Sequence, residues 1–146
     1  MFFTPGEGED QPVGGSLITI KATGAYTAGT FFLSETVIEP GFPGPPPHYH
    51  ERLHDMFYVL EGTLTVQLGA ESLEAAPGTF ICVPPGEVHT FANRTDSSVR
   101  FLNFNTPAGW EQYMRDLGAA FASGTPPTSQ AIGEIAARHD FKLAPR

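Results

Sequence analysis

The sequence has little cysteine and little positive charge, and both shortages narrow the classes of protein it can belong to. Cys82 is the only cysteine among 146 residues, so a disulfide within the chain is impossible. Lys and Arg total 8 against 16 Asp and Glu, which gives a formal net charge of -8. This balance argues against nucleic acid and anionic membrane surfaces as partners.

A long hydrophobic run is also missing. The first ten residues, MFFTPGEGED, contain neither a basic region nor a long apolar segment, so we expect no signal peptide and no membrane span there. We therefore expect a cytoplasmic protein. Cys82 lies in the apolar run TFICV, and we expect it to be a small buried core residue, because reactive thiols need an exposed electropositive setting.

Glycine and proline, by contrast, are abundant, and they divide the chain into short segments. The sequence has 16 Gly, 14 Pro, 12 Phe and 40% hydrophobic residues, a composition that excludes a disordered chain. Short runs of alternating or apolar residues between turn residues predict strands, and such a rhythm is typical of a closed all-β barrel. The clearest of these runs are residues 16–23, 30–38, 63–68 and 99–105.

After residue 106 the hydrophobic period changes. Aromatic and apolar residues recur at helical spacing from 110 to 121, and a second short helix is expected at about 129–139. We expect this pair to pack on the outside of the barrel or over its mouth. The sequence is therefore divided into an N-terminal arm (1–15), a barrel (16–106) and a C-terminal helical segment packed on the barrel (107–146).

Candidate metal ligands are concentrated in residues 41–62, GFPGPPPHYHERLHDMFYVLEG. His48 and His50 are two positions apart, so on an extended segment both imidazoles point to the same face. Two neutral imidazoles on one face are half of a transition-metal site. A second segment, GTFICVPPGEVHTFAN at 78–93, carries His89, which could complete a set of three imidazoles from a different strand.

The fourth ligand has two candidates, Asp55 and His54. Imidazole is the better ligand for borderline metals. Strand parity favours Asp55, because it shares a face with Phe57 and Val59, which would line the barrel interior. His54 would then face outward unless the strand bulges there.

These two segments resemble the paired motifs of the cupin superfamily. The first motif is matched by His48, His50, Asp55 and Gly62, and the second by Gly78, Pro84, Gly86, His89 and Asn93. Two departures stand in the first motif: the spacer from Gly41 to His48 is one residue longer than usual, and Asp55 replaces the usual Glu. The resemblance implies an all-β fold, a single antiparallel jelly-roll barrel, with a metal in its mouth and two short C-terminal helices.

The resemblance also implies a chemistry. Among cupins the chain resembles small proteins of the flavonol (quercetin-type) dioxygenase kind, which implies a small aromatic, flavonol-like or enolisable substrate. His48, His50, Asp55 and His89 would hold one divalent transition metal ion, which could be Ni, Fe, Mn, Co, Cu or Zn. Asp55 would also take the substrate proton as the catalytic base, although its arm is one methylene shorter than that of Glu. Strand parity predicts pocket residues Phe57, Val59, Phe91, Phe101 and Asn103.

Two other functions stay open at the level of sequence. A non-redox lyase, isomerase or cyclase acting on a small natural product would use the same ligands without O2. A cupin that binds a metal and a ligand without turnover would keep the site but form no product. In each case we expect a small-molecule partner and a homodimer, to which the N-terminal arm could contribute by adding to a neighbour's sheet.

Overall fold

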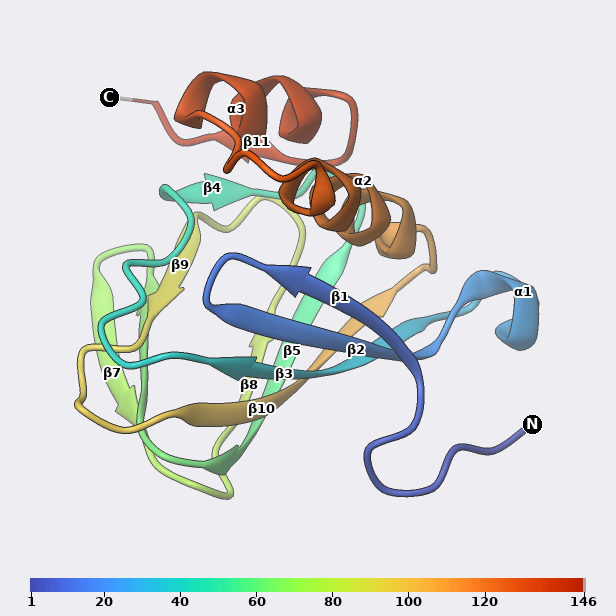
Figure 1. Cartoon of the computed structure of the whole chain (residues 1–146). Helices are drawn as coiled ribbons and strands as arrows, with labels where there is room; N and C mark the ends of the chain where they lie inside the picture. The colour runs from blue at the N-terminus through green and yellow to red at the C-terminus, as the bar shows by residue number, and fades with distance from the viewer. Residues whose placement is uncertain (146) are drawn as a thin grey trace.

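The chain folds into two antiparallel sheets that face each other as a barrel (Figure 1). We describe residues 1–145 of a computed structural model. Its strands are β1 (Glu9–Val13), β2 (Ser16–Ala22), β3 (Phe32–Ile38), β4 (His48–Tyr49), β5 (His54–Glu61), β6 (Leu64–Leu68), β7 (Glu71–Ala75), β8 (Phe80–Val83), β9 (His89–Ala92), β10 (Val99–Thr106) and β11 (Lys142–Leu143). The six-stranded sheet has the order β1-β2-β3-β10-β5-β8, and the five-stranded sheet has the order β11-β4-β9-β6-β7.

Alternation along the strands explains why the sheets close around a core. On β10, Val99, Phe101, Asn103 and Asn105 are buried while the residues between them are half-buried, as period-two patterning requires. The inner faces of both sheets form what we call the barrel cluster. It contains Ile38, Phe57, Val59, Leu64, Val66, Ala75, Ile81, Val83, Val99 and Phe101.

Helices gather at one end of the barrel. In Figure 1, α2 (Trp110–Ala122) and α3 (Ser129–Ala137) lie together over the end that carries β4 and β11. Their apolar faces pack with residues of β2 and β3 in a second core region, which we call the helical cluster. It contains Ile18, Ile20, Phe32, Leu53, Trp110, Tyr113, Leu117, Ile135, Ala136 and Phe141.

The predicted all-β antiparallel barrel with two short C-terminal helices is confirmed. One short helix was not predicted: α1 (Gly24–Thr27) lies between the strands expected at residues 16–23 and 30–38. Among the described residues, no helix combines the length and the apolar character that crossing a membrane requires.

Within the expected N-terminal arm, residues 9–13 form β1, which pairs antiparallel with β2 of the same chain. One sequence expectation about the sheet edges was wrong. Cys82 is exposed instead of buried, because Ile81 and Val83 take the inward positions of β8 and parity sends Cys82 outward. An uninterrupted apolar run predicted burial on both faces, whereas β8 lies at a sheet edge with its outer face open.

Candidate metal centre

A constrained loop delivers the first imidazole to the barrel mouth. Gly44 has a φ of +82°, and a Cβ on it would lie only 1.7 Å from the carbonyl oxygen of Phe91, so only glycine fits this close approach. The Thr90 hydroxyl donates to the carbonyl of Pro45, the residue after Gly44, at 2.6 Å. The proline run that follows has restricted φ angles, and it leads into His48, which pairs with His89 between β4 and β9.

Four predicted side chains converge at this end of the barrel. Each of His48, His50, Asp55 and His89 is buried and offers one potential ligand atom, and these four atoms all lie within 4.8 Å of one another. They come from β4, the turn after it, β5 and β9. Segments distant in sequence are thus brought to one point by the barrel topology.

The three imidazoles are each oriented by a backbone carbonyl. Nδ1 of His48 donates to Pro46 O at 2.9 Å, and Nδ1 of His89 donates to Glu87 O at 3.1 Å. Nδ1 of His50 donates to Asp140 O at 2.5 Å. A carbonyl only accepts, so each Nδ1 carries a proton, and each neutral ring presents the lone pair of Nε2 as its free ligand atom.

Asp55 is held by two amides from the neighbouring strand. Asn103 and Asn105 on β10 each donate an Nδ2–H to Asp55 Oδ1 at 2.8 Å. The second oxygen, Oδ2, lies 3.0 Å from Nε2 of His89 and 3.4 Å from Nε2 of His50. Because both donors engage Oδ1, Oδ2 is the oxygen left to face the imidazoles.

This arrangement fits a bound cation. Neutral imidazoles direct Nε2 lone pairs toward Oδ2 of Asp55, so acceptors face acceptors. Nε2 of His50 is buried and has no hydrogen-bond partner within residues 1–145, a state that ordinarily costs free energy. Protonating all the rings would place like charges side by side in a buried site, whereas one divalent metal ion would satisfy every acceptor together.

The pKa shifts of His48 and Asp55 favour the charge states that bind metal, a neutral imidazole and an ionised carboxylate. Burial, reinforced by the charge of His89, lowers the pKa of His48 to about 3, so this ring is neutral at neutral pH. Burial opposes ionisation of Asp55, but hydrogen bonding and attraction from the protonated forms of His50 and His89 lower the pKa of its carboxyl below the usual range. Burial lowers the pKa of His50, and the Asp55 carboxylate outweighs that effect and raises it.

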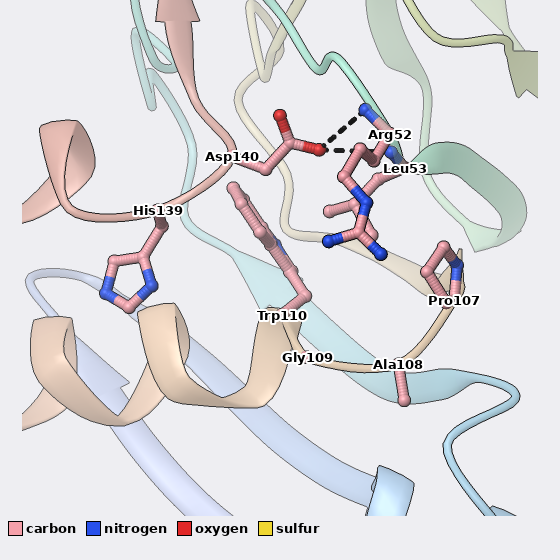
Figure 2. Close-up of a pocket in the computed structure, with 8 residues that line it drawn as sticks. All are labelled: Arg52, Leu53, Pro107, Ala108, Gly109, Trp110, His139 and Asp140. Atoms are coloured by element: carbon pink, nitrogen blue, oxygen red, sulfur yellow. Dashed lines mark hydrogen bonds between the residues drawn. The ribbon is translucent and has the colours of Figure 1, made fainter.

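The C-terminal segment covers the imidazoles from outside the barrel. The ring of Phe141 stacks on His48 with centroids 4.1 Å apart and an interplanar angle of 9°. Trp110, at the start of α2, meets His50 edge-on at 4.9 Å. Trp110 and Asp140 also line a cavity of about 160 Å³ (Figure 2). Trp110 therefore contacts both this cavity and His50.

The other sequence candidates are placed as follows. His54 is exposed at the start of β5, and it is absent from the buried group, as parity predicted. The predicted pocket side chains face the barrel interior. There the ring centroids of Phe57, Phe91 and Phe101 lie 5.5 to 5.7 Å apart. Val59 is fully buried in the same core. Asn103 donates to Asp55. Contact between the predicted pocket residues and a substrate stays a prediction.

Sequence reasoning missed several residues that touch the site. Asn105 lies directly opposite Asp55 in the register of β5 and β10, and the shared parity of Asn103 and Asn105 was the signal that could have found it. Asp140 and Phe141 lie about ninety positions from the imidazoles they contact. No local pattern could reveal those contacts, because they depend on how the C-terminal segment packs.

Comparison with known proteins agrees with this geometry. Residues 34–105 match the cupin domain family. Over 116 residues the chain is 33% identical to quercetin 2,3-dioxygenase of Bacillus subtilis (strain 168), a match that covers 77% of this chain and 33% of that protein. The chain thus spans about a third of the length of this curated relative.

Solved structures give the same fold. KdgF from a Halomonas species superposes with a TM-score of 0.67 at 22% identity, covering 77% of this chain and 99% of that one. The polyketide cyclase RemF from Streptomyces resistomycificus gives 0.63 at 25% identity, covering 73% and 78%. With its matched domain, its barrel and its two helices, the chain is a small cupin that resembles quercetinase-like proteins.

Proposed function

We propose that the chain is a metal-dependent oxygenase that acts on a small aromatic, flavonol-like or enolisable substrate. His48, His50, Asp55 and His89 would hold one divalent transition metal ion, Ni, Fe, Mn, Co, Cu or Zn. The observation that carries the proposal is the convergence of four buried ligand atoms within 4.8 Å, with the imidazoles already oriented by carbonyls. The similarity to a quercetin dioxygenase supports the choice of chemistry.

When bound, such an ion would supply Lewis-acid chemistry that stabilises an enolate or catecholate oxygen of the substrate and supports its reaction with O2. The protein's own contribution is orientation and exclusion of water. The hydrogen bonds on Nδ1 keep each imidazole in one tautomer. The buried surroundings lower the local dielectric, which strengthens the attraction between an anionic substrate oxygen and the site.

Asp55 has a narrower role than the sequence suggested. Oδ1 already accepts two amide N–H groups, so only Oδ2 is left to bind metal or accept a substrate proton. In this proposal Asp55 binds the metal through Oδ2. It serves as a general base only when Oδ2 moves away from its position beside the Nε2 atoms of His50 and His89. Asn103 and Asn105 oppose that movement, because it would stretch both of their hydrogen bonds.

That tether is the observation that favours a second candidate function, a non-redox lyase, isomerase or cyclase. A carboxylate that stays fixed suits polarising a bound oxygen more than shuttling a proton. The likeness to a polyketide cyclase at 25% identity points the same way. Binding of a metal and a ligand without turnover is the outcome that remains if neither activity is found.

Oxygen uptake by reconstituted protein tests the proposal. Separate samples loaded with each of the six metals would be mixed with a flavonol such as quercetin, in air and without O2. We expect metal-dependent O2 uptake that is lost in His89→Ala and retained in the matched control His54→Ala, whose imidazole is exposed. Product formed equally without O2 would instead establish the non-redox function, and tight binding without product would exclude both enzymes.

We also propose that the chain acts as a homodimer in the cytoplasm. β1 of the N-terminal arm pairs with β2 of its own chain and is the outermost strand of its sheet, so β1 is the strand that would add to the sheet of a second copy. Light scattering tests the oligomer, and a monomer at micromolar concentration would contradict it. Fluorescence microscopy of a tagged chain tests the location.

A further inference from the structure

Asp140, between α3 and β11, accepts hydrogen bonds from the backbone of the turn that follows His50. Its Oδ1 accepts the backbone N–H of Glu51 at 2.7 Å. Its Oδ2 accepts those of Arg52 and Leu53 at 2.9 and 3.1 Å, and Figure 2 shows these last two bonds converging on one oxygen. Three consecutive N–H groups thus share one carboxylate, an arrangement that fixes the position of residue 140 relative to the turn.

The backbone of the same residue holds the imidazole itself. The carbonyl oxygen of Asp140 accepts from His50 Nδ1 at 2.5 Å. The side chain therefore fixes where the carbonyl lies, and the carbonyl fixes how the ring of His50 is turned. Asp140 acts on the metal centre through His50, without offering a ligand of its own.

The residues after Asp140 continue along the second imidazole. Phe141 stacks flat on His48. β11 then pairs with β4, placing Leu143 opposite His48. The N–H of Ala144 donates to the carbonyl of Pro47 at 3.0 Å. Residues 140–144, which we call the C-terminal strap, thus run beside both imidazoles of the first motif, His48 and His50.

We propose that the C-terminal strap is a positioning element of the metal centre, anchored by Asp140, which sets the orientation of His50 and His48 and thereby the metal affinity. The inference rests on the proposed metal centre. The strap lies outside residues 34–105, the part that matches the cupin domain family. Residues 34–105 therefore supply the ligands, and a segment that follows them aligns two of these, His48 and His50.

The expected size of the effect follows from the behaviour of outer partners of metal-bound histidines. Such a partner fixes the tautomer and ring orientation, and its loss typically lowers metal affinity about 10- to 100-fold. His89 provides an internal control, because its Nδ1 donates to Glu87 O, two residues away, and not to the strap. A loosened strap should disturb His50 and leave His89 unchanged.

Metal titration of matched variants tests the proposal. Co(II) affinity would be measured by competition with a chromophoric chelator for wild type, Asp140→Ala, Asp140→Asn and Asp116→Ala. Asp116 is the control because it binds His139 Nε2 at 2.8 Å and so tethers the same segment without touching a ligand. We expect a loss of about 10- to 100-fold for Asp140→Ala, a smaller loss for Asp140→Asn, and an unchanged affinity for Asp116→Ala.

A second readout works without any metal. Proton–nitrogen NMR of the metal-free protein reports which nitrogen of each ring carries the proton. We expect the Nδ1–H form of His50 in wild type, a tautomer mixture in Asp140→Ala, and the same signal for His89 in both. This measurement tests the strap even if wild type binds no metal, a result that would refute the proposed function separately.

Either of two results would overturn the proposal. The first is a Co(II) affinity for Asp140→Ala equal to that of wild type. The second is a loss in Asp116→Ala equal to that in Asp140→Ala. It would mean that any loosening of the C-terminal segment lowers affinity, and that the hydrogen bonds of Asp140 have no specific role. If Asp140→Ala fails to fold, Asp140→Asn carries the test, because its amide oxygen can still accept N–H groups from the turn.

Discussion

The barrel cluster and the helical cluster are both apolar, but they stand in different relations to the metal centre. The barrel cluster lies wholly within residues 34–105, and its rings, Phe57 and Phe101, pack on each other and on Phe91. Leu53 is the only member of the helical cluster in that range, and two of the other members, Trp110 and Phe141, touch metal-site imidazoles.

The barrel cluster therefore holds the two sheets together, whereas the helical cluster aligns the metal site. Packing in the barrel cluster closes the two sheets and so brings four ligands from distant strands to one end. Packing in the helical cluster presses two aromatic rings against His48 and His50. Substitutions in the first region should therefore change mainly stability, and substitutions at the imidazole contacts of the second should change mainly metal affinity.

The largest effect should come from Phe101→Ala in the barrel cluster. Phe101 is 1% exposed, and truncating a fully buried Phe leaves a cavity that costs about 3–5 kcal/mol. Urea denaturation would measure this loss. The metal affinity of the fraction that remains folded should equal that of wild type, and a parallel fall in affinity would break the distinction between the two regions.

His89→Ala should be the largest change in metal binding. It removes a ligand outright, so we expect a loss above about 100-fold, beyond the range seen when an outer partner is removed. Isothermal titration with Co(II) gives the affinity. His54→Ala serves as the control, because His54 is exposed on the same protein. Retained affinity in His89→Ala, or a comparable loss in His54→Ala, would refute the ligand assignment.

Phe141→Leu sharpens the comparison from the helical side. Leucine keeps most of the apolar volume but loses the flat ring that stacks on His48 at 4.1 Å. We expect about a tenfold loss of Co(II) affinity, with the midpoint of urea denaturation nearly unchanged. A variant that loses stability but keeps affinity would show that Phe141 is an ordinary core residue.

The smallest effect is expected where α2 meets β1, far from the ligands. Arg115 donates two N–H bonds to Glu9 at 2.8 and 2.9 Å, and this surface ion pair should contribute below about 1 kcal/mol. Because Arg115 lowers the pKa of Glu9, the contribution exists above the usual Glu range and disappears as pH falls through the lowered pKa.

Arg115→Met should therefore cost stability at neutral pH and less at an acid pH well below the usual Glu range. Urea denaturation of both proteins at the two pH values measures the difference. Metal affinity should stay at the wild-type value, because neither partner touches the site. A stability loss that is the same at both pH values would show that the pair contributes through packing and not through charge.

The sequence predicted the barrel because its signals are local. Turn residues between short apolar runs, and the alternation on β10, are visible without any partner strand. The same parity placed Asp55 inward and His54 outward. Cys82 was misplaced because an apolar run reveals hydrophobicity but not whether anything covers the outer face of its strand.

The orientation of the site could not be predicted, because it depends on contacts between distant segments. The bond from His50 to Asp140 joins residues 90 positions apart. The grip of Asn105 on Asp55 depends on the exact register of β10 against β5, and a shift of one residue would turn both side chains to the other face. Spacing identified which residues could be ligands, and packing decides how they are aligned.

The most direct test of the account is elemental analysis of the protein purified without chelator and then exposed to divalent transition metals. We expect about one equivalent of metal per chain and a near-complete loss of that metal in a double variant with His48→Ala and His89→Ala. Binding of no metal by wild type, or equal metal content in wild type and the double variant, would contradict the account.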